Sequence, residues 1–316
     1  MEEHALSATP PSGPRQSDSD LRNGLFAGVL AYVLWGLLTI YWKKLHGFPP
    51  FELIGWRIMA SFVVLVGLAI ANRRVKAIAK AAFSRKLAAR IAAAALLVTV
   101  NWSSYVWAVS HDHVIETALG YFMAPLLTMW LGVAVLKEKL NTAQKTTISL
   151  AVVAICILTV GYGRLPILAL LIAGSWALYG LLKRQVPMSS LESLTAEMMW
   201  LVLPAIVLAI TQSSKTPSIT NSADGVHWAL VLFTGVITVI PLWMFGFAAK
   251  RVPLTVLGPL QYSVPTINFL LGWLAYNEEL DATRVVGFAF VWAALVVLAI
   301  DTARRSQRVR VQRAIN

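Results

Sequence analysis

Arg57 and Glu116 are ionisable side chains within long apolar segments, where charge is expensive. Arg57 lies about five residues, or about 8 Å, into the segment Glu52–Ala71, and Glu116 begins the segment Ile115–Leu136. Burying a charge in a bilayer costs about 2.5–3.5 kcal/mol or more, so such residues usually face a cavity or a partner. One interpretation makes Arg57 and Glu116 a gate or a proton-linked pair at the outer mouth. The alternative is that Arg57 extends its side chain to the membrane interface.

Polar residues form stripes on two further segments. Asn101 and Tyr105 are four residues apart and share a helix face, as do Gln261, Pro265 and Asn268. These stripes are candidate cavity walls that carry hydrogen-bond donors and acceptors. The alternative is that they make hydrogen bonds between neighbouring helices, as small polar residues often do in membranes.

Aromatic residues and two prolines complete the candidate site. Most of the 12 Trp and 8 Tyr are expected in interfacial belts. Four lie deeper in their segments and could stack on an aromatic or cationic solute, namely Trp35, Trp102, Trp176 and Tyr262. Pro125 and Pro265 each remove a backbone hydrogen bond, so we expect them to break or kink their helices and free carbonyl groups in mid-membrane.

Catalytic and metal-binding patterns are absent. The sequence has no Walker A, H-E-x-x-H, G-x-S-x-G or C-x-x-C motif. His111, Asp112 and His113 are too close in sequence for a helix to point the two histidines together, so an interfacial turn is favoured over a metal site. The single cysteine, Cys156, excludes an intramolecular disulfide. We therefore expect no enzyme activity, no cofactor and no metal.

The amino-acid composition indicates that transmembrane helices position these candidate residues. Of the 316 residues, 58% are hydrophobic and 13% are charged, whereas soluble domains carry about 25% charged residues. Apolar segments of the length that a bilayer requires recur along the chain. They predict an all-α membrane protein of ten transmembrane helices, at Gly24–Leu45, Glu52–Ala71, Ala88–Val109, Ile115–Leu136, Thr142–Val160, Leu165–Leu182, Leu191–Thr211, Val226–Ala249, Thr255–Tyr276 and Ala282–Ile300.

The basic residues predict the orientation in the membrane. Of the 27 Lys and Arg, 21 belong to the two tails and to the loops after every second segment, when residues at the adjoining segment ends are counted with the loops. Counted in the same way, 5 belong to the other loops, and Arg57 lies inside a segment. The positive-inside rule then places both termini in the cytoplasm. The net charge of +12 is explained in this way without a nucleic-acid partner. Residues 1–23 are expected to be a disordered tail, 301–316 a basic tail, and Ser213–Gly225 an unstructured outer loop.

An internal repeat divides the membrane region. A shift of 140 residues places Pro125 on Pro265, Gly132 on Gly272 and Glu138 on Glu278. The chain is then two repeats of five helices, 24–160 and 165–300. Because five is odd, the second repeat enters the membrane inverted, as in many secondary transporters. Chance similarity between apolar segments is the alternative.

Several segments resemble a known family. The segments ALGYFMAPLLTMWLGVAVLKEKL at Ala118–Leu140 and LGPLQYSVPTINFLLGWLAYNEEL at Leu257–Leu280 are similar to the paired helices of EamA-type permeases, in the drug/metabolite transporter superfamily. AYVLWGLLTIYWKKL (Ala31–Leu45), ELIGWR (Glu52–Arg57), NWSSYVWAVSHDHVIETALGYF (Asn101–Phe122) and SWALYGLLKR (Ser175–Arg184) resemble the RarD branch more closely. The resemblance implies a ten-helix permease of the bacterial inner membrane.

The leading hypothesis is therefore a secondary transporter in the lipid bilayer. It would export a small organic metabolite or drug-like solute in exchange for protons, with direction and coupling implied by the resemblance alone. Two alternatives are a membrane-embedded enzyme acting on lipid-linked substrates, with His111–Glu116 as its only candidate cluster, and a non-transporting sensor or subunit. The sequence identifies neither the solute nor the oligomeric state.

Overall fold

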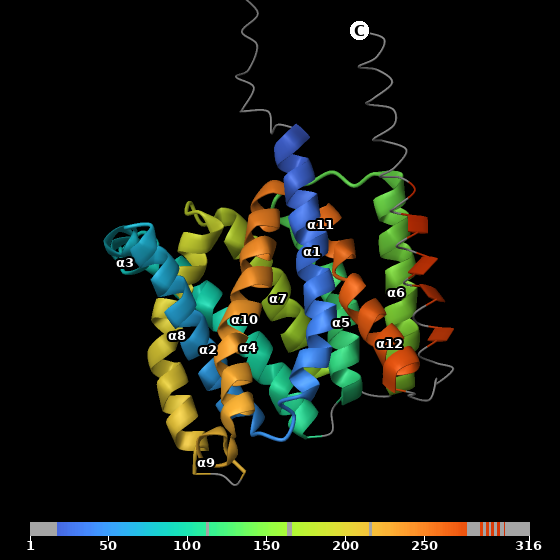
Figure 1. Ribbon diagram of the computed structural model, residues 1–316. Helices are drawn as coiled ribbons and strands as arrows, with labels where there is room; N and C mark the ends of the chain where they lie inside the picture. Colours follow the sequence, from blue (N-terminus) through green and yellow to red (C-terminus); the bar gives the residue numbers. More distant parts are fainter. Residues whose placement is uncertain are drawn as a thin grey trace, which may run out of the picture.

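The computed structural model describes residues 18–111, 114–162, 166–214 and 217–276, with individual helical residues between 285 and 300. In this part of the chain every regular element is an α-helix, and the helices pack side by side (Figure 1). The elements are α1 (Asp18–Lys43), α2 (Pro50–Ala71), α3 (Val75–Ala82), α4 (Ala88–Ser110), α5 (Val114–Ala134), α6 (Thr142–Tyr162), α7 (Ile167–Gln185), α8 (Ser190–Gln212), α9 (Ile219–Ser222), α10 (Gly225–Arg251), α11 (Leu254–Leu260) and α12 (Ser263–Tyr276).

The predicted apolar segments coincide with these helices as far as Thr255–Tyr276, which α11 and α12 cover together. The last predicted segment, Ala282–Ile300, lies mostly outside the described residues, so the count of ten helices stays a prediction. Among the described residues, six helices are long and apolar enough to cross a membrane, namely α1, α2, α4, α7, α8 and α10. The chain is thus a multi-pass membrane protein.

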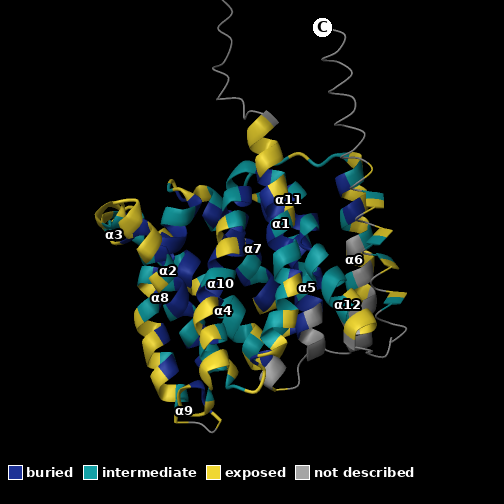
Figure 2. Cartoon of the chain, in the orientation of Figure 1, coloured by how far each residue is buried: buried dark blue, intermediate teal, exposed yellow. Residues whose placement is uncertain are grey.

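Large apolar side chains cover the outside of the bundle. Phe26, Val63 and Leu203 expose 69%, 69% and 70% of their surface. Figure 2 shows exposed residues along the outer faces of the helices and buried residues between them. Contiguous apolar surface of this kind is costly in water, whereas lipid tails solvate it without cost.

Two segments are more ordered than the sequence predicted. The helix α1 begins at Asp18, so the last six residues of the predicted tail are helical, and Asp20 lies in the first turn, where negative charge stabilises a helix N-terminus. The predicted outer loop contains α9, whose first backbone N–H groups donate to the buried carboxylate of Glu52 at 2.8 Å from Ile219 and 3.3 Å from Thr220. A distant acid therefore orders this loop.

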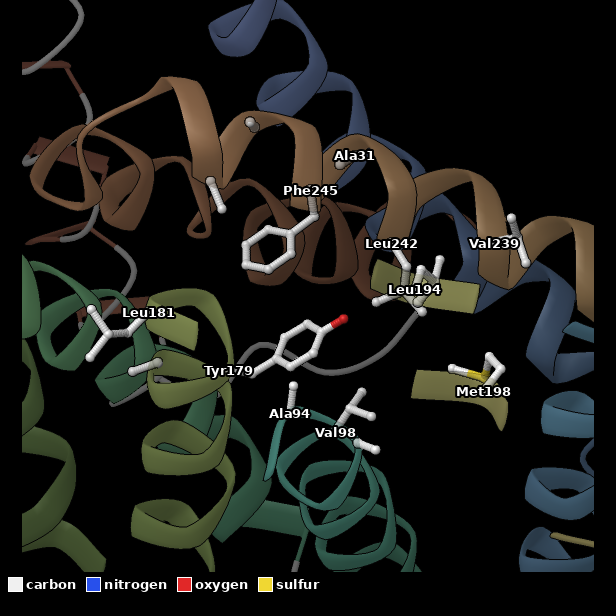
Figure 3. Packing of buried hydrophobic residues seen from close by; sticks show 14 of the residues in the cluster. Ala31, Ala94, Val98, Tyr179, Leu181, Leu194, Met198, Val239, Leu242 and Phe245 are labelled. Atoms are coloured by element: carbon white, nitrogen blue, oxygen red, sulfur yellow. The ribbon is translucent and has the colours of Figure 1, made fainter. Parts of the chain in front are cut away.

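The main core lies where α4, α7 and α8 meet α1, α2 and α10. In Figure 3, Tyr179 of α7 and Phe245 of α10 face each other, with Ala94 and Val98 of α4 on the far side of Tyr179. Because these helices come from both ends of the sequence, one continuous core joins the two parts of the chain.

Glycines allow the closest helix contacts. A Cβ atom on Gly235 of α10 would lie 2.5 Å from the backbone of Ala60 in α2, and one on Gly55 of α2 would lie 2.8 Å from the carbonyl oxygen of Ala205 in α8. Small residues let membrane helices approach closely, where dispersion contacts hold them together. The helix α2 is thereby fixed against both α8 and α10.

The helices continue differently at the two prolines, and the expected kinks stay a prediction. The helix α5 continues through Pro125. In the second stretch the break falls at Gln261–Tyr262, between α11 and α12, and Pro265 lies in the first turn of α12, where the missing N–H has no helical partner to lose. Short i→i+3 hydrogen bonds, Gln261 to Gly258 and Tyr262 to Pro259, close that break.

Candidate functional site

A cavity of about 190 Å³ lies in the middle of the bundle. Its walls come from α1, α2, α4, α5, α7, α10 and α12 and from the turn between α11 and α12. The lining residues are Tyr32, Trp35, Leu38, Thr39, Trp42, Arg57, Asn101, Trp102, Tyr105, Tyr121, Ala124, Ile172, Trp176, Thr238, Leu242, Gln261, Val264 and Asn268. Elements far apart in sequence therefore build one site.

Arg57 is the only ionised side chain among these lining residues. Its guanidinium carbon lies 3.8 Å from the centre of the Trp102 ring and 5.4 Å from that of Trp42. Its Nε is buried and has no hydrogen-bond partner, and no described carboxylate lies within ion-pair distance. In the described part of the chain, the guanidinium of Arg57 therefore lies against aromatic rings and not against a carboxylate.

Aromatic rings form much of the remaining wall. The rings of Trp35 and Trp176 meet edge to face with centres 5.2 Å apart, and Tyr32 packs on Trp35 at 5.6 Å. Tyr105 and Tyr121, which also line the cavity, lie with ring centres 5.9 Å apart. Rings held by other rings have few alternative rotamers, so the cavity presents rigid flat walls.

The three amide side chains of the cavity bind neighbouring helices. Asn101 donates to the carbonyl oxygen of Ile172 at 2.8 Å, and Gln261 donates to Thr128 at 2.9 Å. The amide oxygen of Asn268 accepts from Thr39 at 2.8 Å. The two interpretations of the polar stripes therefore coexist, because these residues line the cavity and also link helices.

Eight of the predicted site residues meet at the cavity: Trp35, Arg57, Asn101, Trp102, Tyr105, Trp176, Gln261 and Asn268. Tyr262 does not, because its ring is fully buried against Phe122 and its hydroxyl donates to the Phe122 carbonyl at 3.0 Å. Whether the eight bind a solute stays a prediction.

Glu116 belongs to the first turn of α5, but its side chain lies outside the described residues, as do Asp112 and His113. The predicted pairing of Arg57 with Glu116 therefore stays a prediction. Among the described residues, no three His, Cys, Asp or Glu side chains lie together as metal ligands would.

The sequence analysis missed one face of α1. Tyr32, Thr39 and Trp42 line the cavity beside Trp35, at spacings of three and four residues. That spacing places them on one face of a helix. Thr238 of α10 was also missed, and its buried hydroxyl has no hydrogen-bond partner. The spacing could have revealed the α1 face, whereas a lone threonine gives no such signal.

A second polar group lies in the opposite half of the bundle, which we call the sealed cluster: Tyr179, Lys183, Ser193 and Glu197. Lys183 and Glu197 are 2.8 Å apart, and both side chains are fully buried. Ser193 also donates to Glu197 at 2.9 Å, and Tyr179 donates to its other oxygen at 3.0 Å. Every charge in this cluster is compensated.

Comparison with known proteins identifies relatives over nearly the whole chain. The model of the EamA-like transporter family matches twice, at residues 22–160 and 164–300. The RarD protein of Streptomyces exfoliatus is 42% identical over 297 residues, which cover 93% of this chain and 94% of that protein. The RarD protein of Escherichia coli (strain K12) is 32% identical, covering 91% and 98%.

Two further matches agree. An uncharacterized transporter, YojE of Bacillus subtilis (strain 168), is 33% identical and covers 90% of this chain and 96% of that protein. A crystal structure of a protein superimposes with a TM-score of 0.66, covering 88% of this chain and 98% of that chain. At 18% identity this last likeness bears on the fold alone.

Proposed function

Because the chain belongs to the EamA-like transporter family, in its RarD branch, we propose that it is a secondary transporter whose central cavity binds a small organic solute. The observation that carries the proposal is the position of the cavity, between helices of the first and the second family match. Sites of this kind are typical of transporters built from repeats.

We further propose that the two matched stretches are inverted repeats. In Figure 1, α1 and α7 run in opposite directions, and α3 and α9 lie at opposite ends of the bundle. The contacts support the same relation, because α1 packs on α10 as α7 packs on α4, and α2 packs on α8. Two such halves can rock about a fixed central site and expose it to each side in turn.

The positive-inside rule assigns the ends of the bundle. The end that carries α3 and the start of α1 is rich in Lys and Arg. We therefore propose that this end is cytoplasmic and, from the charge distribution along the sequence, that both chain termini are cytoplasmic. The cavity residues Trp42, Arg57 and Tyr105 lie toward the opposite end, which carries α9. In this proposal the sealed cluster lies toward the cytoplasmic end and joins the neighbouring helices α7 and α8.

The solute is small in this proposal. Sites for drug-sized ligands usually have volumes of about 300–1,000 Å³, and this cavity is smaller. We propose export of a metabolite across a bacterial inner membrane in exchange for protons, a direction and coupling suggested by the family resemblance.

A flux assay in proteoliposomes tests the proposal. Under an imposed pH gradient, at least one member of a broad metabolite panel should move in the presence of the protein, and a protonophore should abolish the movement. Trp102→Ala, in the cavity wall, should slow the flux, whereas Val63→Ala, on the lipid-facing surface, should not. Absence of gradient-driven flux for every solute would overturn transport, while flux that survives the protonophore would overturn proton coupling alone.

A further inference from the structure

The charge on the cavity wall determines which class of ligand the cavity can bind. Arg57 brings a guanidinium to the wall, and among the described lining residues no carboxylate balances it. Its buried Nε–H has no acceptor. An unpaired cation in a poorly solvated place gains most from an oxyanion, which guanidinium binds with two parallel hydrogen bonds.

The aromatic walls alone would fit a cation, since Trp faces attract positive charge. Here the position over Trp102 is already taken by Arg57, at 3.8 Å. A second cation in a cavity of about 190 Å³ would lie close to the guanidinium and be repelled, more strongly than in water because the surroundings have a low dielectric constant. The charge therefore excludes cationic solutes, and the rings remain available for a flat apolar body.

We propose that the cavity recognises a small organic anion, with its carboxylate on Arg57 and an aromatic or similarly flat body between Trp35, Trp176 and the Tyr105–Tyr121 pair. Thr238 supplies a further hydroxyl that has no partner of its own. The proposal rests on the transporter function and adds the chemical class of the solute.

Three ligands with one body test it: 3-phenylpropionate, 3-phenylpropanol and 3-phenylpropylamine, which differ in charge at the end of the chain. Binding is followed by tryptophan fluorescence of the full-length protein in detergent, since four Trp line the cavity. We expect the anion to bind the wild type about ten- to a hundredfold more tightly than the alcohol, and the amine not to bind.

Variants of Arg57 test the contribution of its guanidinium separately from that of the other cavity residues. Arg57→Gln should abolish the preference for the anion and leave binding of the alcohol unchanged, whereas Arg57→Lys should retain part of the preference. Gel filtration shows whether each variant is folded. Should Arg57→Gln misfold, the dependence of wild-type affinity on ligand charge decides the question by itself.

A lipid headgroup carries the same oxyanion chemistry as a free carboxylate. Binding is therefore repeated in nanodiscs of phosphatidylcholine with and without phosphatidylglycerol. Equal affinity for the anion in the two membranes supports a free solute. Competition by phosphatidylglycerol would overturn the proposal in favour of a headgroup site.

Three other outcomes overturn it: equal affinity for the three ligands, tighter binding of the amine, or no binding of any ligand at millimolar concentration. Failure of the proposed function is distinguishable from these. Binding that depends on Arg57 without flux of any solute would refute transport alone, whereas flux of neutral or cationic solutes that is unaffected in Arg57→Gln would refute the anion site alone.

Discussion

Arg57 of α2 and Glu197 of α8 are each the eighth residue of their helix, and the 140-residue shift relates them. Their surroundings are opposite. Glu197 is fully buried and receives hydrogen bonds from Lys183, Ser193 and Tyr179, whereas Arg57 faces a cavity and the rings of Trp42 and Trp102. The sealed cluster holds its own counter-ion, whereas the described residues that line the cavity include no carboxylate.

The protein thus contains buried charges of two kinds, one with a partner in the protein and one that faces a cavity. A buried charge whose partner is also present needs no ligand, and the Lys183–Glu197 pair links α7 to α8 within one half of the bundle. A charge without a counter-ion is unfavourable in the empty protein, and a ligand can relieve it. The same position along the helix can thus serve helix packing in one half and recognition in the other.

The largest expected effect is in the sealed cluster. Lys183→Met leaves the carboxylate of Glu197 buried without its cation, and we expect the free energy of unfolding to fall by about 3–5 kcal/mol. Arg57→Met is the matched control and should lose less stability, because it removes the stacking on Trp102 but leaves no buried charge without its partner. Unfolding titrations in detergent measure both.

The double variant Lys183→Met with Glu197→Met sharpens this test. Replacing both partners by apolar residues of similar volume is often neutral or stabilising, so most of the lost stability should return. If Lys183→Met and Arg57→Met lose equal stability, the distinction between a sealed and an open charge is wrong.

A smaller effect is expected where the two parts of the chain touch. Gly235→Ala places a Cβ atom 2.5 Å from the backbone of Ala60, so α10 must move away from α2. Overpacking of this kind costs about 1–3 kcal/mol. Gly174→Ala, also inside a membrane-spanning helix but with open space around it, should cost nothing. Thermal unfolding of both variants makes the comparison, and an equal loss would show that the close contact is not the cause.

The sequence predicted the helical segments well, because a spanning helix must be apolar along its whole length. It also predicted many cavity residues, since Asn101 or Arg57 in such a segment needs a partner or a cavity, and the cavity lining includes both. The family assignment is confirmed by the matches over both stretches.

Other features depend on contacts that the sequence does not reveal. Tyr262 has the same local pattern as the cavity aromatics, yet its hydroxyl finds the Phe122 carbonyl and the ring is buried. The sealed cluster was missed because Lys183 was counted as a loop residue, whereas α7 continues to Gln185 and carries the lysine inward. The order of α9 likewise depends on Glu52, which is distant in sequence.

The smallest effect concerns one hydroxyl in each region. Tyr179→Phe keeps the ring stacked on Phe245, with centres 6.0 Å apart, and removes only the hydrogen bond to Glu197. Lys183 and Ser193 still donate to the other carboxylate oxygen, so the charge stays compensated. Hydrogen bonds between membrane helices average about 0.6 kcal/mol, and those to charged groups reach about 1.5–3 kcal/mol, so we expect a loss of about 1 kcal/mol.

Tyr105→Phe is the counterpart in the cavity, where the ring is 38% exposed. Tyr105 lines the space that a solute would fill, so removing its hydroxyl should leave the unfolding midpoint unchanged and weaken solute binding. The two variants together distinguish a hydroxyl that links two helices by a hydrogen bond from one that contacts a ligand. If Tyr105→Phe loses as much stability as Tyr179→Phe, the Tyr105 hydroxyl holds the cavity wall together by the same kind of hydrogen bond as in the sealed cluster. The aromatic residues of the cavity would then serve helix packing and not ligand binding.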